Sequence, residues 1–326
     1  MNLFFHVIIF IAIFIIYINI VHLLKTSEDL EIYELDYKDN DYFQEVCNLK
    51  QPVTFSYKDI YPDFVDSINK DFLDVKENND IKIKEVPDYY SEEITNVDYF
   101  ILPLKSYLSL IKSDTHGNYI SEDNHFFIEE SGSFDLYQTN DNILQPNLPI
   151  NKKYDLLCGS KGSHTTFKYH NNLRYYLITH TGKIKIKMTP WKSTKYLYPI
   201  KDYYNYEFRS PINVWKPQRK YFSEMDRLKF LDFELENGQA LYIPPYWWYS
   251  IQYTSDDTIV SAFTYDTLTN YLANCKDIGL YYLQQSNTKT KITKTFELPT
   301  NETPLDNDTN EEDAIRKNET IIESNI

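Results

Sequence analysis

The pattern of apolar and polar residues divides the chain into an apolar start, a β-rich middle and a polar tail. Residues 3–24 carry no formal charge and are mostly Ile, Phe, Val and Leu. As a helix, this segment would be roughly 33 Å long, enough to cross a hydrocarbon core of about 30 Å. It lacks the positive start and the small-residue cleavage site of a signal peptide. We therefore predict an uncleaved transmembrane anchor over residues 1–25, with a buried core helix as the alternative.

Alternating patterns predict strands in the middle of the chain. Residues 52–55 predict an edge strand that begins at a proline, and residues 81–86 alternate as a half-buried strand does. Strand patterns dominate residues 154–265, with turns at Gly182 and Gly238. The fold is therefore expected to be mainly β.

Two segments have helical spacing and flank the predicted strands. Residues 103–112 predict one helix. Residues 267–285 predict a closing helix with Leu268, Leu272 and Cys275 on one side. The predicted fold class is thus mainly β with flanking helices.

Composition divides the chain further and limits its partners. Residues 26–45 are acidic and predict a stalk, residues 46–286 predict one globular domain, and residues 287–326 predict a disordered acidic tail. The net charge of −15 argues against nucleic acid as a partner. The three cysteines are far apart and odd in number, which favours reduced thiols over a disulfide framework.

The side of the membrane on which the domain lies is left open. Lys25 and the unpaired cysteines favour a cytosolic domain. Three Asn-x-Thr sequons in the tail favour the opposite side, but a tail rich in Asn and Thr produces sequons by chance.

Four motifs follow one another in the β-rich part. They are TTFKYH at residues 165–170, SPIN at 210–213, LENGQALYIP at 235–244 and YWWYSI at 246–251. Together they resemble the cupin-like and JmjC-like double-stranded β-helix proteins, the fold of the Fe(II)/2-oxoglutarate hydroxylases. The resemblance covers residues 46–286 and implies a cupin or jelly-roll domain.

A narrower resemblance concerns residues 208–213, 246–251 and 283–285. These segments are similar to membrane-anchored cupin-like proteins of large DNA viruses. That likeness implies a single-pass protein of a host or virion membrane.

The resemblance also implies where iron would bind, and these positions hold unsuitable residues. It places the iron histidine on Lys168, the iron carboxylate on His170 and the distal histidine on Tyr249. An ammonium offers no lone pair, a phenol has a pKa near 10, and no histidine follows His180. A shift of two residues would use His170 and Asn172, and it still supplies no carboxylate. We therefore predict no metal site, no catalytic residue and no cofactor.

The strand after Gly182 contains three lysines, any of which could bind the carboxylate of a cosubstrate if its side chain pointed into the barrel. Lys183, Lys185 and Lys187 alternate with apolar residues, which favours all three lysines in water. The alternative turns one of them, such as Lys183, inward to bind a carboxylate ligand.

A polar pocket with aromatic walls is expected even without a metal. Trp247 and Trp248 are expected to serve the core first, because large aromatic residues beside a β-turn usually do so. Lys168, His170 and Tyr249 should converge on the barrel mouth, and with Lys183 and the two tryptophans they are the candidate binding residues.

Three hypotheses about function follow. The favoured one is a non-catalytic binding or structural module at a membrane, with a protein or small molecule at the barrel mouth. The alternative is an oxygenase with rearranged ligands that uses Fe(II) and 2-oxoglutarate. A third is a hydrolase or isomerase with His170 as base and Tyr249 as acid.

Overall fold

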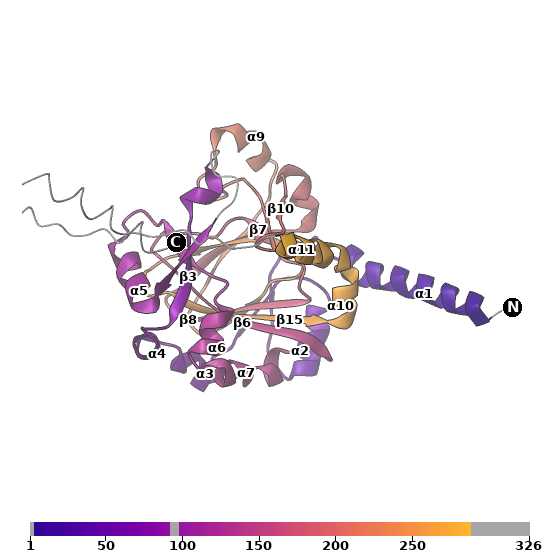
Figure 1. Cartoon of the computed structure of the whole chain (residues 1–326), viewed down its shortest axis with the longest axis horizontal. Helices are drawn as coiled ribbons and strands as arrows, with labels where there is room; N and C mark the ends of the chain where they lie inside the picture. The colour runs from indigo at the N-terminus through magenta and orange to yellow at the C-terminus, as the bar shows by residue number, and fades with distance from the viewer. Residues whose placement is uncertain (1–2, 92–97, 288–326) are drawn as a thin grey trace, which may run out of the picture. The chain divides into compact units, whose positions relative to one another are not determined.

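The computed structural model describes residues 3–91 and 98–287. The predicted disordered tail lies, from residue 288 onward, outside the described residues. Within the described ranges the chain forms two β-sheets with helices around them (Figure 1). This agrees with the predicted mainly β fold with flanking helices.

The sheets bring together strands that are far apart in sequence, and the neighbours are antiparallel except β1 and β2. The larger sheet has the order β1 (Tyr33–Glu34), β2 (Val53–Ser56), β13 (Gln239–Tyr242), β8 (Arg174–Thr181), β15 (Ile259–Thr267), β6 (Pro149–Gly159), β5 (Tyr119–Ser121), β3 (Asp80–Glu85) and β4 (Tyr99–Pro103). The smaller sheet has the order β10 (Ile200–Asp202), β11 (Glu207–Arg209), β7 (Lys168–Tyr169), β14 (Trp248–Tyr253), β9 (Ile184–Thr189) and β12 (Leu231–Leu235).

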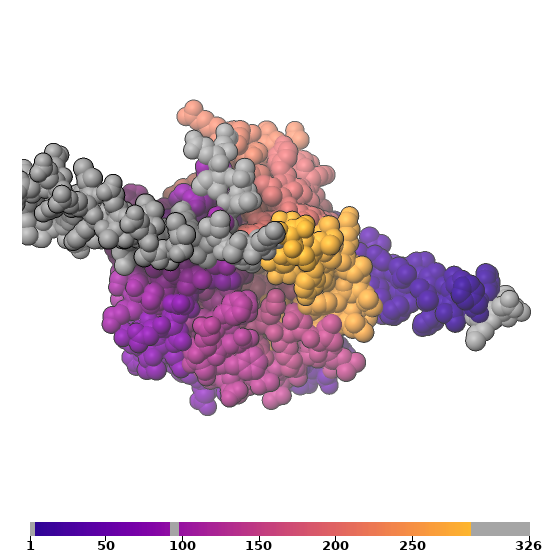
Figure 2. Space-filling model, viewed as in Figure 1, coloured from indigo at the N-terminus to yellow at the C-terminus, as the bar shows by residue number. Residues whose placement is uncertain are grey.

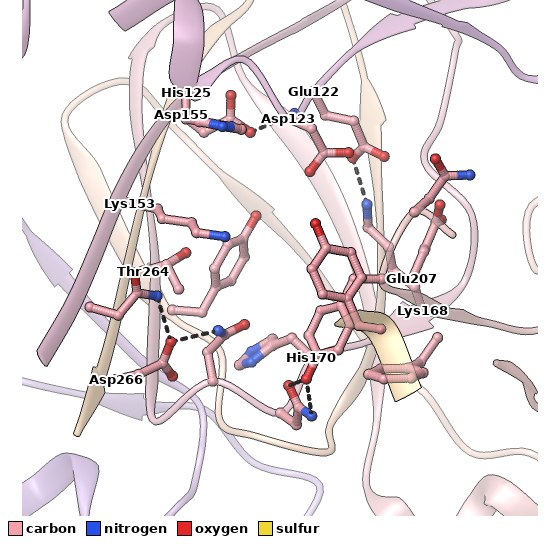
Figure 3. Close-up of a pocket in the computed structure, with 18 of the residues that line it drawn as sticks. Glu122, Asp123, His125, Lys153, Asp155, Lys168, His170, Glu207, Thr264 and Asp266 are labelled. Carbon is pink, nitrogen blue, oxygen red and sulfur yellow. Dashed lines mark hydrogen bonds and ion pairs between the residues drawn. The ribbon is translucent and has the colours of Figure 1, made fainter. Parts of the chain in front are cut away.

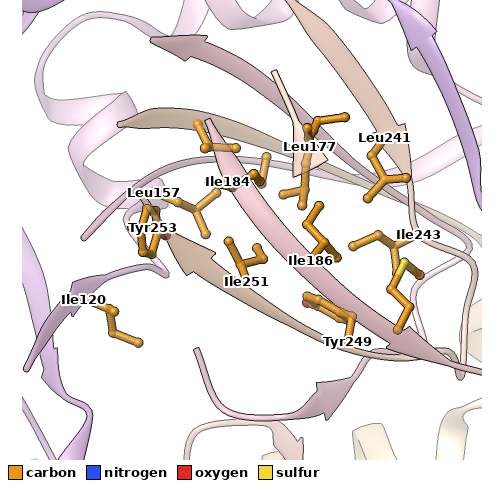
Figure 4. Packing of buried hydrophobic residues seen from close by; sticks show 14 of the residues in the cluster. Ile120, Leu157, Leu177, Ile184, Ile186, Leu241, Ile243, Tyr249, Ile251 and Tyr253 are labelled. Carbon is orange, nitrogen blue, oxygen red and sulfur yellow. The ribbon is translucent and has the colours of Figure 1, made fainter. Parts of the chain in front are cut away.

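The main core lies between the inner faces of the two sheets. Ile184 and Ile186 of β9 are fully buried and share one apolar cluster with Leu177 and Leu241 of the larger sheet (Figure 4). Successive strand residues point to opposite faces, so the lysines between them point away from this core. Lys183 and Lys185 form ion pairs with Glu234 of β12 instead. The prediction is confirmed for Lys183 and Lys185. Lys187 also points away from the core, but its side chain is only 20% exposed, because it pairs with Asp232 and lies over the Trp215 ring.

Both predicted glycine turns are confirmed. Gly182 joins β8 to β9 with φ +67°, and Gly238 joins β12 to β13 with φ +81°. Side chains other than glycine rarely adopt these angles. A Cβ atom on Gly182 would also lie 2.6 Å from the hydroxyl oxygen of Thr258.

Helices cover the outside of the larger sheet and connect its strands. Helices α3 (Pro62–Ser67), α6 (His125–Glu130) and α7 (Phe134–Gln138) lie along its outer face (Figure 1). The remaining short helices are α2 (Asn40–Cys47), α4 (Lys70–Val75), α5 (Leu104–Ser113), α8 (Asp141–Leu144), α9 (Phe222–Met225), η2 (Pro87–Tyr90), η3 (Trp191–Tyr196) and η4 (Arg219–Tyr221). Helix α5 confirms the helix predicted at residues 103–112.

The predicted closing helix is two helices, α10 (Leu268–Ala273) and α11 (Cys275–Asn287). The break falls at Asn274, whose side-chain amide donates to the carbonyl oxygens of Asn171 and Asn270. Asparagine side chains compete with the helical backbone in this way. Leu268 and Leu272 share a side as expected, yet that side is exposed, at 59% and 46% of the residue surface.

The predicted stalk at residues 26–45 is partly built into the domain. β1 pairs in parallel with β2, Leu35 is buried, and the Asp39 carboxylate caps α2 by accepting from the Tyr42 backbone N–H. The globular part therefore begins at about residue 33. Residues 52–55 were predicted to form an edge strand. This prediction is wrong, because β1 pairs with the outer side of β2 and is itself the edge.

The N-terminal segment forms α1 (Leu3–Asn19), followed by the π-helical turn η1 (Ile20–Leu24). The span from Phe4 to Leu24 is long and apolar enough to cross a membrane, a property that signal sequences share. Most of its side chains are exposed, whereas Ile18 and His22 near its end are buried. Figure 2 shows this end of the helix emerging beside the surface of α10 and α11.

Candidate functional site

A cavity of about 450 Å³ lies between the sheets and is bordered on one side by α10 and α11. Its walls combine lysines, carboxylates and asparagines with tyrosines and a few apolar side chains (Figure 3). Lys168, His170 and Tyr249 all line it, so the structure brings these three candidate residues together.

The strand register accounts for this convergence. Lys168 of β7 lies directly opposite Tyr249 of β14. His170 follows two residues after Lys168, and its ring centroid is 6.1 Å from that of Tyr249. Paired positions in an antiparallel sheet have Cβ atoms about 5 Å apart, so the residue types at these positions decide the chemistry of the wall.

The turn between β13 and β14 holds Tyr249 at this position. Tyr246 adopts a φ of +65°, and its backbone N–H donates to the carbonyl oxygen of His170 at 2.8 Å. The backbone N–H of Trp247 donates to the carbonyl oxygen of Pro244 at 3.2 Å. The Pro-Pro turn is therefore tied to the end of β7, which fixes the approach of the two strands.

Lys168 belongs to a buried network of charges. Its ammonium lies 2.6 Å from one carboxylate oxygen of Glu122, and Lys84 lies 2.9 Å from the other. Lys84 also pairs with Asp123 at 2.6 Å and lies 3.9 Å from Glu207. The side chains of Lys84, Glu122 and Glu207 are less than a tenth exposed, so water screens these charges little.

The network sets the charge of its members. Burial by itself lowers the pKa of Lys168, but the nearby carboxylate of Glu122 more than reverses this effect and holds the pKa above its ordinary value. Burial likewise tends to raise the pKa of Glu122, and the ammonium groups of Lys168 and Lys84 keep it below its usual range. Lys168 therefore stays an ammonium and Glu122 a carboxylate near neutral pH.

His170 and Tyr249 stay uncharged for the opposite reason. Burial lowers the pKa of His170 to about 3, and its Nε2 lies 3.1 Å from the carbonyl oxygen of Ile243. A neutral ring with its proton on Nε2 donates to that oxygen. Burial also raises the pKa of Tyr249 to about 12. Near pH 7 the cavity wall therefore presents a neutral imidazole and a neutral phenol beside the ammonium of Lys168.

This set of donors does not fit an Fe(II) site. Such a site needs two imidazoles and a carboxylate on one side of the metal. The corresponding positions here present an ammonium, a protonated phenol and one imidazole. Within residues 3–91 and 98–287, no three His, Cys, Asp or Glu side chains are grouped as metal ligands.

The structure places the other three candidate residues outside the cavity. Trp247 and Trp248 are fully buried in the cores, and the Trp248 indole donates to the hydroxyl of Thr194 at 2.8 Å. Lys183 is exposed and lies 2.7 Å from Glu234 on the outer side of the smaller sheet. These residues support the fold around the cavity.

The carboxylates that line the cavity were not among the residues predicted from the sequence; they are Glu122, Asp123, Asp155, Glu207 and Asp266. Asp155 accepts from the backbone N–H groups of Asp123 and Asn124, and burial raises its pKa to about 7. The only signal in the sequence was the acidic pair at 122–123 directly after a short strand. No pattern in the neighbouring sequence predicts that this pair contacts Lys168, which lies 46 residues after Glu122.

The comparisons with known proteins agree with this architecture. The model of the cupin-like domain family matches residues 43–271, more than half of the chain and nearly all of both sheets. No curated protein sequence matches the chain. The residues matched include the cavity wall on β7 and β14 and the turn that positions it. The chain therefore belongs to the cupin-like domain family.

Proposed function

We propose that this protein is a membrane-anchored binding or structural module whose cavity takes a polar ligand without the help of iron. The observation that carries the proposal is the ion pair between Lys168 and Glu122. Lys168 occupies the position where the resemblance to the hydroxylases puts the first iron histidine.

The electrostatics of that position support the proposal. A cation placed near His170 and Tyr249 would meet the ammonium of Lys168, which Glu122 holds in place at 2.6 Å. Binding a metal would require Lys168 to lose its proton or leave its partner, and the raised pKa of Lys168 opposes the first of these. The cavity itself remains large enough for a small molecule.

The anchor is part of the same proposal. Only 11% of the most apolar 18-residue stretch within Phe4–Leu24 is buried, which favours contact with lipid over burial in the domain. The narrower likeness of residues 208–213, 246–251 and 283–285 to membrane-anchored proteins of large DNA viruses would put the domain at a host or virion membrane.

The competing hypothesis is an oxygenase with rearranged ligands, and metal binding separates the two. The full chain, purified in detergent, would be analysed for bound metal and then melted with Fe(II) or Mn(II), with and without 2-oxoglutarate. We expect no rise in melting temperature. A ligand at 100 times its dissociation constant would stabilise the protein by about 2.7 kcal/mol, which such a melt detects readily.

A triple variant serves as the positive control. Lys168→His, His170→Asp and Tyr249→His would place two imidazoles and a carboxylate on the converging positions, and we expect this variant to melt higher with Mn(II). Stoichiometric iron in the unmodified protein, or iron-dependent formation of succinate from 2-oxoglutarate, would overturn the proposal and establish the oxygenase.

A further inference from the structure

The end of the N-terminal helix is held by the domain. The ammonium of Lys50, three residues after the end of α2, donates to the carbonyl oxygens of Val21 at 2.7 Å and His22 at 3.1 Å. Lys50 is only 4% exposed, so this contact is shielded from water. A cation at the C-terminal end of a helix is favourable, because the free carbonyl groups carry partial negative charge. The domain thus binds the last turn of the span through the hydrogen bonds of Lys50.

The segment that follows the span is also tied down. Lys192 of η3 donates to the carbonyl oxygen of Glu28 at 3.1 Å, and its ammonium lies 3.5 Å from the carboxylate of the same residue. The side-chain amide of Gln51 donates to the carbonyl oxygen of Glu31 at 3.2 Å. β1 then joins the sheet at Tyr33. The connection therefore contacts the domain at two exposed points before β1 begins, which leaves the domain next to the end of the span.

Exposed leucines lie on three segments of the domain that the contacts bring near this point. Helix α10 contacts both α1 and η1 (Figure 2). It exposes Leu268 and Leu272. Leu49, which directly precedes Lys50, is 58% exposed. Leu148 is 87% exposed, and the next residue, Pro149, pairs with Thr267 at the start of α10. We call these four leucines the membrane seat.

We propose that the membrane seat rests on the lipid bilayer, so that the domain sits on the membrane surface and does not hang from a flexible stalk. This inference rests on the proposed transmembrane anchor. The last residues of a spanning helix lie at the level of the lipid headgroups. The Lys50 ammonium contacts those residues, and the Cα atoms of Lys50 and Leu49 are about 3.8 Å apart, so Leu49 lies within about one lysine side chain of that level.

Lipid is a better occupant of the seat than another protein. Lipid surrounds the end of any spanning helix, whereas a protein partner would have to displace it. The chain carries a net charge of −15, so anionic lipid headgroups would repel it. The seat itself is apolar, so its contact with lipid does not depend on charge. Phosphatidylcholine is therefore the lipid for the test.

The experiment measures the depth of two seat positions in the full chain. Cys275 is exposed and would be changed to Ser, while Cys47 and Cys158 are buried and should not react. Leu49→Cys and Leu272→Cys, each in that background, would carry a fluorescent label in phosphatidylcholine nanodiscs. Val75→Cys is the matched control, because Val75 is 77% exposed at the end of α4, far from α1 (Figure 1).

We expect lipids with a nitroxide near the headgroup to quench the labels at positions 49 and 272 several-fold more than the label at position 75. Equal quenching at all three positions, in a protein that resists an alkaline wash, would refute the seat and leave the anchor intact. Release of the full chain by that wash would refute the anchor itself. Pairing of labels between two copies, without lipid quenching, would assign the surface to a second copy and overturn the proposal.

Discussion

Replacing Lys168 by Met removes one of the two ammonium groups that neutralise Glu122. The Lys168→Met side chain keeps most of the apolar stem, so the change acts mainly on charge. Glu122 is 4% exposed in its side chain and would then depend on Lys84, which also serves Asp123 and Glu207. Breaking a buried ion pair on one side costs about 3–5 kcal/mol. Because Lys84 remains, we expect a loss near the lower end, about 3 kcal/mol.

A loss of that size should lower the melting temperature by about 6–12 °C, since a domain of this size shifts by about 2–4 °C per kcal/mol. Thermal unfolding of the full chain in detergent, at pH 7.5, measures it. Lys183→Met is the matched control, because Lys183 also pairs with a carboxylate but both partners are exposed, and it should leave the melting temperature unchanged.

The double variant Lys168→Met with Glu122→Gln tests the cause. It removes the charge that was left without its partner, so it should recover much of the loss. If Lys168→Met melted within about 2 °C of the unmodified protein, as Lys183→Met should, Lys168 would not be a buried ionic partner. A metal ion near His170 and Tyr249 would then not be opposed by an ammonium held in place at position 168.

Two further predictions concern stability. The folded state keeps His170 neutral, with a pKa of about 3 against about 6.5 when unfolded, so the unfolded state binds more protons between these values. The free energy of unfolding should therefore fall as the pH drops from about 6.5 toward 4, and less so in His170→Gln, as urea titrations at several pH values would show; equal slopes for both proteins would contradict this. A Cβ atom on Gly159 would overlap the Tyr253 ring and lie 2.6 Å from the Ser163 hydroxyl oxygen, so Gly159→Ala should cost about 1–3 kcal/mol. Gly279→Ala, where nothing lies within 4 Å, should not destabilise the protein, and a similar loss in both variants would rule out the clash as the cause.

Local patterns determined those parts of the structure that depend on neighbouring residues. The alternation at residues 183–188 gave the inward face of β9, because adjacent strand residues point to opposite sides. Gly182 and Gly238 marked their turns, since the backbone there needs a positive φ. The family motifs placed Lys168, His170 and Tyr249 on one wall of the cavity. The pairing of β7 with β14 sets Lys168 directly opposite Tyr249, as the positions of the two motifs implied.

The tertiary structure alone decided the partners of those residues. Glu122 meets Lys168 across 46 positions of sequence, because β5 and β7 belong to different sheets that border the same cavity. Lys84 lies on a strand whose alternation gives no sign of a buried charge, yet it is only 5% exposed because Glu122 and Asp123 cover it. Leu268 and Leu272 likewise have the spacing of a buried face, and they are exposed since α10 packs with its opposite side. Periodicity fixes which residues share a face, whereas the packing of distant elements fixes what that face meets.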